Sequence, residues 1–371
     1  MSGWSTKGKY SCPSCGFETA SLWLNHSKKY CYMCHRRWLE ENHKFRYNSK
    51  AFDGTEELRS APKPPSGTIV LRQLENLGSS IGDANADGPQ PWKKSILFTL
   101  SYWEHHLLRH NIDVMHIEKN VCDNILGTLL NQKKKTKDNY KARLDLEDMG
   151  IRSVLHLKTR PGSNTKFLSR ACYQMTSKEK EDFLKILKNV RAPDEYSCNI
   201  SRCMQLKQRK IIGLKSYDCH VLMQELLSIA IKGSLPNKVS SVIIELCRFF
   251  KEICSKVLNL HDLERLESQV AVTLCQMEKI FPPSFFTVMV HLIIHLASEA
   301  KVGGPIHYRW MYLIERYLLT LKSFVCNRAH PEGSIAEGYL AHECLNFCLQ
   351  YLLGVETRFN RPRRMMNPIV I

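Results

Sequence analysis

The feature that most constrains this chain is its first segment, residues 1–47, which is dense in Cys, His, aromatic and basic residues but poor in aliphatic ones. Such a segment cannot bury enough apolar surface to fold by itself, so something else must hold it together. It carries two Cys-x-x-Cys pairs, Cys12/Cys15 and Cys31/Cys34, and the second pair is followed directly by His35. Four soft ligands at this spacing suit a tetrahedral Zn²⁺ ion with Zn–S distances of about 2.3 Å. We therefore predict a structural zinc-binding module.

The fourth ligand of this predicted site is open between Cys34 and His35, and His26 is a weaker candidate. The alternative is that the cysteines are unligated thiols in a reducing cell, but the segment would then lack a reason to fold. A group of basic residues surrounds the site, and it fits either contact with phosphate or a solvated face: Lys28, Lys29, Arg36 and Arg37.

The overall charge favours a polyanionic partner. The chain has 53 Lys and Arg against 36 Asp and Glu, which gives a net charge of +17 and a pI near 9.2. Released counterions drive such basic proteins onto nucleic acid. Fifteen cysteines, many of them inside apolar helical patterns, are typical of the cytosol or nucleus and not of a disulfide-bonded secreted protein. No apolar run approaches the length of about 18 residues that a membrane span needs, and no signal peptide is expected.

Hydrophobic periodicity predicts a largely helical chain after a polar, Gly- and Pro-rich stretch. That stretch, from about residue 49 to 91, is expected to be a linker or mobile loop with one short helix near Val70–Leu77. Ser95–Leu100 has the pattern of a short strand, and the lysines at 133–135 open a loop-rich stretch that extends to about residue 175. Helices are expected at about 113–130, 177–189, 218–232, 238–258, 262–279, 284–299, 309–326 and 334–353.

Two of these helices carry polar residues with a candidate role. Asp113, His116 and Asn120 share one helical face, so a carboxylate, an imidazole and an amide point the same way. An Asp that caps a helix, followed by a hydrogen-bonded His, explains this pattern about equally well. In the stretch 309–322, Glu315 is a lone acidic residue, and such residues usually lie at the surface or in an ion pair.

A further pair, His291 and His295, lies one helical turn apart, with Glu299 one turn beyond. That geometry can hold zinc. However, the glutamate that acts as general base in H-E-x-x-H hydrolases is missing, and Leu292 stands in its place. We favour buried or hydrogen-bonded histidines over a metal site here.

Several strings along the chain carry a family resemblance. They include SGWSTKGK at 2–9, CYMCHRR at 31–37 and RHNIDVMHIEKNV at 109–121, and they continue at 137–146, 199–203 and 216–220. These strings resemble the plant CACTA-type (En/Spm) transposases. The strings FPPSFF at 281–286, GGP at 303–305, YRWMY at 308–312 and PEGSIAE at 331–337 are similar to the domain of unknown function that commonly follows these transposases in plant proteins.

The resemblance implies an RNase H-like nuclease core, in which three carboxylates hold two divalent metal ions that activate water or a DNA 3′-hydroxyl. It assigns Asp113, His116 and Asn120 to a family motif that follows the second carboxylate, and Glu315 to the helix of the third. In the family pattern a small residue is expected where this chain has Cys34. The resemblance therefore leaves Cys31 and His35 as the family-like ligand pair.

The first two carboxylates would precede Ser2, so we expect both to be absent from this polypeptide. One glutamate cannot hold two Mg²⁺ ions. Mg²⁺ binding is therefore expected only if the missing carboxylates are supplied, and no strand cleavage or transfer is expected from this polypeptide alone.

Together these arguments predict an α+β, predominantly helical protein with six parts. They are a zinc-knuckle-like basic module at 1–47, a linker or mobile loop at 48–92, a partial RNase H-like core with the D-x-x-H motif at 93–135, a mostly helical insertion at 136–240, a helical domain of unknown function at 241–355 and a basic tail at 356–371.

For function, we expect a nuclear, transposon-derived and truncated protein that binds DNA through phosphate contacts and lacks a complete strand-transfer site. The alternative is a helical interaction module that acts with a full-length transposase or another nuclear partner. Neither a membrane nor a small-molecule substrate is expected.

Overall fold

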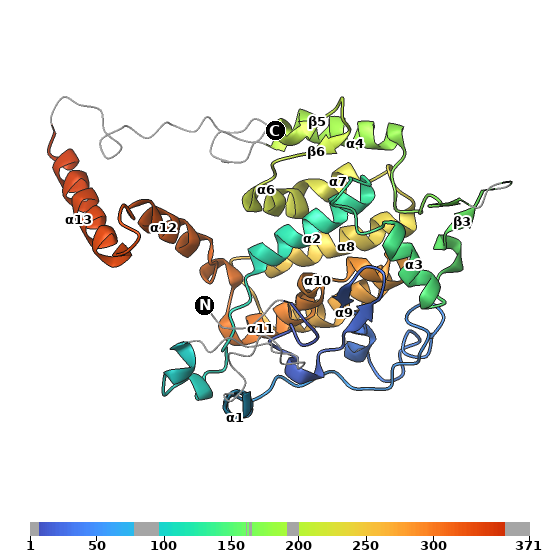
Figure 1. Cartoon of the computed structure of the whole chain (residues 1–371), viewed down its shortest axis with the longest axis horizontal. Coiled ribbons are helices and arrows are strands. Elements are labelled where there is room, and N and C mark those ends of the chain that lie inside the picture. Colours follow the sequence, from blue (N-terminus) through green and yellow to red (C-terminus); the bar gives the residue numbers. More distant parts are fainter. Residues whose placement is uncertain (1–6, 78–95, 161, 163–164, 191–199, 353–371) are drawn as a thin grey trace. The chain divides into compact units, whose positions relative to one another are not determined.

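Long helices dominate the computed structural model, which describes residues 7–77, 96–160, 162, 165–190 and 200–352 (Figure 1). The α-helices are α1 Gly67–Leu77, α2 Val114–Leu129, α3 Tyr140–Asp148, α4 Ser177–Asn189, α5 Ile200–Cys203, α6 Ser216–Val221, α7 Leu227–Ala230, α8 Asn237–Ile253, α9 Leu260–Ile280, α10 Val288–Leu292, α11 Leu296–Gly303, α12 Tyr312–Ser323 and α13 Pro331–Gln350. Strands β1 Leu22–Leu24 and β2 Lys29–Cys31, β3 Lys158–Thr159 and β4 Lys166–Phe167, and β5 Met204–Gln205 and β6 Lys210–Ile211 pair as three antiparallel hairpins.

The amphipathic pattern located the long helices well. In α8, the residues Val239, Ile243, Leu246 and Phe250 recur at intervals of three and four and are all buried, as one face of a helix packed on a core requires. Helix α4 begins where the sequence places it because Thr176 and Glu179 form a capping box, in which each side chain accepts a hydrogen bond from the backbone N–H of the other. The short helix expected near Val70–Leu77 is confirmed as α1.

The core of residues 1–309 is a set of packed helices. Helix α8 packs on α9 and α11, α9 also packs on α11, and α2 packs on α6 and α10. The N-terminal segment is attached to this helical core at several points. The Tyr32 N–H donates to the Phe286 carbonyl at 2.8 Å, and the Asp145 carboxylate in α3 accepts from the backbone N–H groups of His26 and Ser27 at 2.8 and 3.1 Å. The segment thus folds on the helices and does not depend on a core of its own.

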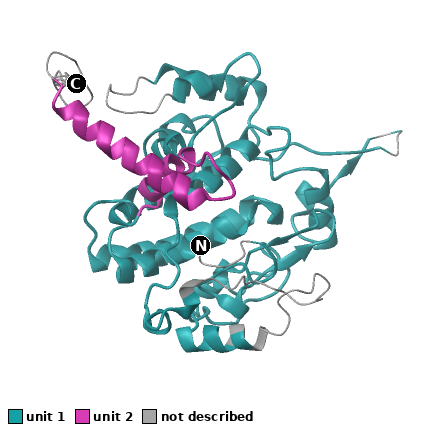
Figure 2. Ribbon diagram, turned by 60° about the vertical axis from the view of Figure 1, so that its left-hand side comes forward, with its two compact units in different colours: residues 1–309 teal, residues 310–371 magenta. Residues whose placement is uncertain are grey.

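The chain divides into two compact units, residues 1–309 and 310–371 (Figure 2). Helices α12 and α13, which belong to the second unit, contact each other. Gly338 lies so close to Phe324 that a Cβ atom at this position would stand 2.6 Å from the Phe324 Cβ. None of the described side chains of this unit is buried, and many of its large apolar side chains are exposed.

Three expectations differ from the structure. The predicted strand at Ser95–Leu100 is wrong for its described part, because Ile96–Thr99 is a 3₁₀ helix. Phe98 there packs edge-on against Trp103, with ring centroids 4.7 Å apart, and a short apolar run does not by itself distinguish strand from helix. Helix α3 lies in the stretch expected to be loop-rich; the Asn139 side chain caps it by accepting from the Ala142 N–H. Finally, the described strands form no sheet of more than two strands, so an RNase H-like sheet is not seen in this part of the chain.

The described residues include no helix with the length and apolar character that crossing a membrane requires. The proposed basic tail at 356–371 lies outside the described residues, as does most of the Gly-rich part of the proposed linker.

Replacing Phe250 by Ala is expected to lower the free energy of unfolding by about 3–5 kcal/mol, because its ring is fully buried in the helical core. Urea denaturation would measure the change. Val257→Ala is the control: this side chain is 86% exposed, so its loss is expected to change stability by less than about 0.5 kcal/mol. Equal losses for the two variants would contradict the described packing.

Candidate metal centre

Four ligand-type side chains from the two ends of the first unit meet at one buried point. They are Cys12, Cys15, His291 and His295, and their ligand atoms all lie within 4.8 Å of one another. The Cys15 Sγ atom is 3.3 Å from Nε2 of His291 and 3.2 Å from Nε2 of His295, and the Cys12 Sγ atom is 3.3 Å from Nε2 of His295. Around a tetrahedral Zn²⁺ with ordinary bond lengths, sulfur and nitrogen ligands stand about 3.5 Å apart. The four side chains therefore already have nearly the spacing that a metal ion imposes.

Local backbone geometry brings each pair of ligands together. The chain turns sharply after Cys12: the Gly16 N–H donates to the Cys12 carbonyl at 2.9 Å, and the Cys15 N–H donates to the Cys12 Sγ atom at 3.4 Å. Gly16 has a left-handed backbone with a φ angle of +55°, a conformation that residues other than glycine rarely adopt. His291 lies in α10, and His295 ends the 3₁₀ turn that follows it, so both imidazoles project from one side of the same helical stretch.

The surroundings favour ionisation of one thiol of the group and oppose ionisation of the other. Burial opposes ionisation of Cys12, but the hydrogen bond with Cys15 and the charges of His295 and His291 outweigh it, so the pKa of Cys12 lies well below its ordinary value. The hydrogen bond with Cys12 and burial raise the pKa of Cys15. Burial lowers the pKa of His291, which favours the neutral imidazole, the form that binds metal ions.

The geometry also leaves one nitrogen without a partner. His291 Nδ1 is buried and has no hydrogen-bond partner among the described residues. A buried polar atom in this state is costly. The nitrogens that face the sulfurs are the Nε2 atoms of His291 and His295, and this donor set of two sulfurs and two imidazole nitrogens could bind a metal ion.

Aromatic side chains surround this group and exclude water from it. The Trp38 ring lies 5.7 Å from the rings of both His291 and His295, measured between centroids, and the His35 ring lies 5.5 Å from that of His291. His35 is itself held by the buried Glu278 carboxylate, which lies 2.5 Å from Nδ1 and accepts from the His35 backbone N–H at 3.1 Å. His35 therefore lies beside the group, and its ring forms part of the aromatic surroundings of His291.

The structure joins Cys12 and Cys15 to the two distant histidines and not to the second Cys-x-x-Cys pair. Cys31 lies in β2, where burial and the Glu278 carboxylate raise its pKa to about 12. Cys34 has a left-handed backbone, and its Sγ atom is 3.6 Å from the Asp53 carboxylate. No described ligand group of three or more includes Cys31, Cys34 or His35.

The weaker candidates also lie elsewhere. His26 forms an ion pair with Asp148 at 3.0 Å. Glu299, one turn beyond His295, accepts from the Ile112 N–H at 2.8 Å and pairs with Arg309 at 3.3 Å. Burial raises the pKa of Glu299 to about 7 against the opposing effect of these partners.

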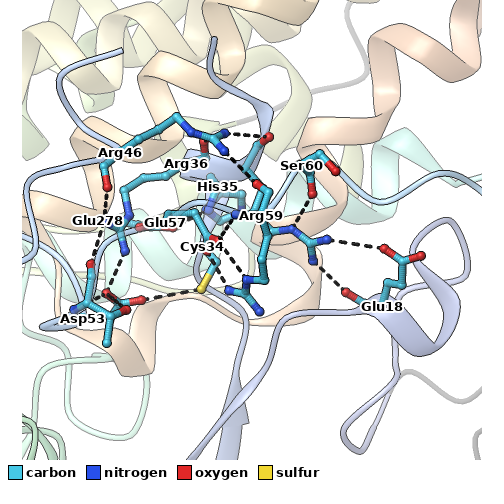
Figure 3. Close-up of polar contacts among 12 residues, drawn as sticks. Glu18, Cys34, His35, Arg36, Arg46, Asp53, Glu57, Arg59, Ser60 and Glu278 are labelled. Carbon is cyan, nitrogen blue, oxygen red and sulfur yellow. Dashed lines mark hydrogen bonds and ion pairs between the residues drawn. The ribbon is translucent and has the colours of Figure 1, made fainter. Parts of the chain in front are cut away.

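The arginines next to the group have an internal role (Figure 3). Arg36 is fully buried; it donates to the Thr55 carbonyl at 3.0 Å, pairs with Asp53 at 2.7 Å and stacks over the Phe52 ring.

Arg37 donates to the carbonyls of Ser60 and Glu18. Arg46 is also buried, and its guanidinium donates to four backbone carbonyls, those of Arg36, Arg37, Leu39 and Arg59.

These guanidinium groups tie the loop at 43–60 to the first segment. Because Arg36 and Arg37 are buried and bonded within the chain, neither the phosphate contact nor the solvated face considered for them fits the structure. Sequence reasoning missed this role, because the sequence does not show whether an arginine side chain is buried or exposed.

The remaining candidates are distributed over two helices. Asp113 caps α2 by accepting from the His116 N–H at 3.2 Å, and the Asn120 side chain donates to the His116 carbonyl at 2.8 Å. The three residues thus bond along their own helix, in agreement with the capping interpretation. Glu315 lies in α12 with its side chain exposed, and no described ligand group of three or more contains it.

Two segments of the chain, one near each end, match models of known protein families. Residues 1–77 match "Transposase family tnp2", and residues 253–366 match "Domain of unknown function (DUF4218)". The two matches indicate a transposase-derived protein. No curated protein and no solved structure matches the chain. In this transposase-derived chain, the tnp2-matching segment supplies the two cysteines of the group and the DUF4218-matching segment supplies the two histidines.

Arg36→Ala is expected to destabilise the protein by about 3 kcal/mol or more, because it removes the buried guanidinium that pairs with the Asp53 carboxylate and donates to the Thr55 carbonyl. Chemical denaturation would measure this loss. The matched control is Arg248→Ala, whose guanidinium is 56% exposed and pairs with Glu245 within one helix; a change below about 1 kcal/mol is expected. An equally small effect at Arg36 would contradict its structural role.

Proposed function

We propose that this chain is a transposase-like protein of the plant CACTA (En/Spm) type, in which a structural Zn²⁺ ion cross-links the first segment to the helical core and basic surface residues bind DNA in the nucleus. The observation that carries the proposal is the shared ligand group. Its cysteines come from the segment that matches a transposase family and its histidines from the segment of unknown function. A metal ion at this point would make the two segments one structural unit.

Zinc is the metal that the donor set favours. Two thiolates and two imidazoles in a closed tetrahedral arrangement are typical of structural zinc sites, whereas oxygen-rich sets suit Mg²⁺ and Ca²⁺. Burial of all four residues leaves no open position for water or substrate, which supports a structural role and not a catalytic one. The polar first segment is the part of the chain that such an ion would stabilise most, because it has little apolar core of its own.

The double variant Cys12→Ser/Cys15→Ser is expected to lose one equivalent of bound zinc per chain, measured by elemental analysis of the purified protein. It is also expected to unfold at a lower temperature, because metal binding contributes directly to folding. Cys172→Ser is the control, since Cys172 is exposed and lies outside the ligand group. His295→Ala should reproduce the loss of zinc. Unchanged zinc content in both ligand variants would exclude the proposed centre.

The described surface contains a groove that suits the phosphate backbone of DNA. It has a volume of about 510 Å³ and is lined by Asn131, Lys133, Lys134, Thr136, Asp138, Asn139, Tyr140, Leu168, Arg170 and Gln174. Lys133 and Lys134 are exposed, and neither forms an ion pair within the described part of the chain. The acidic residue of the groove, Asp138, is buried and paired with Arg143 at 2.5 Å.

The positive charges of Lys133 and Lys134 are therefore uncompensated, whereas that of Arg170 is paired with Glu179 at 2.9 Å. The charge of Asp138 is already balanced by Arg143, and Tyr173 and Gln174 donate further hydrogen bonds to the same carboxylate at 2.8 and 2.9 Å. Two free ammonium groups at the rim can each neutralise a phosphate and release counterions. Such contacts position a protein on DNA without reading its sequence.

Lys133→Glu/Lys134→Glu is expected to weaken binding to duplex DNA by about tenfold or more at 50 mM salt and to reduce the slope of log K against log salt by about 2, one for each lost phosphate contact. Fluorescence anisotropy at several salt concentrations would measure both. Lys207→Glu/Lys256→Glu changes the net charge equally at exposed lysines outside the groove and should have a smaller effect. Absence of binding by the unmodified chain at 50 mM salt would contradict the proposal itself, whereas equal losses for both variants would contradict only the groove.

A second function, docking on a protein partner, is favoured by the second unit. Large apolar side chains of α12 and α13 are exposed, among them Leu313, Leu319, Leu340, Leu345 and Phe347 at 61–71%. Exposed apolar surface of this kind is common at protein interfaces. A full-length transposase is the partner that the family resemblance suggests, and co-purification with it without DNA would favour this alternative.

For catalysis, we propose that the 371-residue polypeptide does not cut or transfer DNA strands by itself. Glu315 would need further carboxylates to bind Mg²⁺, and the described residues place it in no such group. DNA nicking by the purified chain that is abolished by Glu315→Gln would contradict this.

A further inference from the structure

A second set of ligand-type side chains lies away from the cysteine–histidine centre. Glu118 in α2, His220 in α6 and Cys254 at the end of α8 place their ligand atoms within 4.8 Å of one another. The three residues come from separate helices, and α2 packs on α6 in the helical core. Neither family match nor the proposed DNA contact accounts for this group.

Glu118 is the residue that most requires an explanation. Its side chain is 1% exposed, and it forms no ion pair with Lys or Arg in the described ranges. Its carboxylate lies 2.6 Å from His220 Nδ1 and accepts from Gln224 Nε2 at 3.1 Å. Burial raises the pKa of Glu118 against the effect of these two partners. A buried carboxylate needs a compensating positive charge, which a protonated imidazole or a bound metal ion can supply.

Cys254 adds a thiol to the same place. It is half-buried, and burial together with the Glu118 carboxylate raises its pKa. A divalent metal ion at this place would bind the Cys254 sulfur and the Glu118 carboxylate directly.

The backbone next to His220 is unusual as well. Leu222–Leu226 forms a π-helix between α6 and α7, and its Gln224 side chain contacts both Glu118 and His220. π-Helical turns are rare, and they occur frequently at functional sites. Here the turn places an amide donor on the carboxylate, much as outer residues orient the ligands of metal sites.

We propose that Glu118, His220 and Cys254 form a second metal site, which binds a borderline-soft divalent ion such as Zn²⁺ through one oxygen, one nitrogen and one sulfur. Three protein ligands leave one tetrahedral position for water or another small ligand. That position lies toward the half-buried side chains of His220 and Cys254, because Glu118 is enclosed. Metal binding would release to solvent the proton between Glu118 and His220 and the thiol proton of Cys254. The 2.6 Å contact between Glu118 and His220 would lengthen to about 3.3 Å, the edge of a tetrahedron with metal–ligand bonds near 2.0 Å.

The test is metal content after loading the full chain with excess Zn²⁺ and desalting it. The unmodified chain is expected to retain two equivalents, and Cys254→Ala is expected to retain one. Cys247→Ala is the matched control, because this buried cysteine lies two turns earlier in α8 and belongs to neither ligand group; it should retain two. Glu118→Gln, which keeps the shape of the side chain, should retain one.

Loading with Co²⁺ gives a second measurement that does not depend on stability. Cys254→Ala should lose part of the thiolate-to-cobalt absorption, while the part from Cys12 and Cys15 remains. Identical zinc content and identical cobalt spectra in the unmodified chain and in Cys254→Ala would overturn the inference and would leave the hydrogen bond with His220 as the whole explanation of Glu118. Because Cys12→Ser/Cys15→Ser tests the first centre separately, failure of one site is distinguishable from failure of the other.

Discussion

The convergence of two thiols and two imidazoles at one buried point joins the first segment of the chain to the helices that carry His291 and His295. The first segment has few aliphatic residues, so apolar burial alone gives it little stability. It is held instead by polar contacts: the arginines that bind loop carbonyls, the Asp145 carboxylate that accepts from the β1–β2 turn, and the cysteines that face His291 and His295. A metal ion at the cysteines and histidines would add the strongest of these contacts. It would also fix the segment to helices that follow it by more than two hundred residues.

This arrangement changes how the two family matches relate to each other. As sequence, they are separate regions with the long stretch from 78 to 252 between them. In the structure, the second region completes a ligand group that the first begins. This part of the domain of unknown function thus supplies two of the four buried side chains that could bind a metal ion. The intervening helices provide the basic groove at 131–174 and the buried Glu118, which are separate features with separate chemistry.

The sequence predicted much of the secondary structure, because the information it needs is local. Helices α2, α4, α8 and α9 have apolar residues at helical spacing, and α2, α4 and α9 also begin at a side-chain cap; both signals act within a few residues. The errors occurred where local signals are weak. Ser95–Leu100 is too short for its period to decide between strand and helix. The β1–β2 hairpin contacts α3 and the 283–286 turn, which no local pattern reveals.

By itself, the sequence showed two spaced pairs, Cys12-x-x-Cys15 and His291-x-x-x-His295, but it favoured Cys31 with Cys34 or His35 as the partners of the first pair and non-metal histidines for the second. Only the tertiary structure decided how the pairs combine. The spacing of two residues shows only that both lie on one turn of the chain. Which distant pair lies opposite them depends on how the helices pack. The same reason explains the arginines. Charge can be counted from the sequence, but whether a guanidinium faces solvent or binds buried carbonyls is fixed by the fold around it.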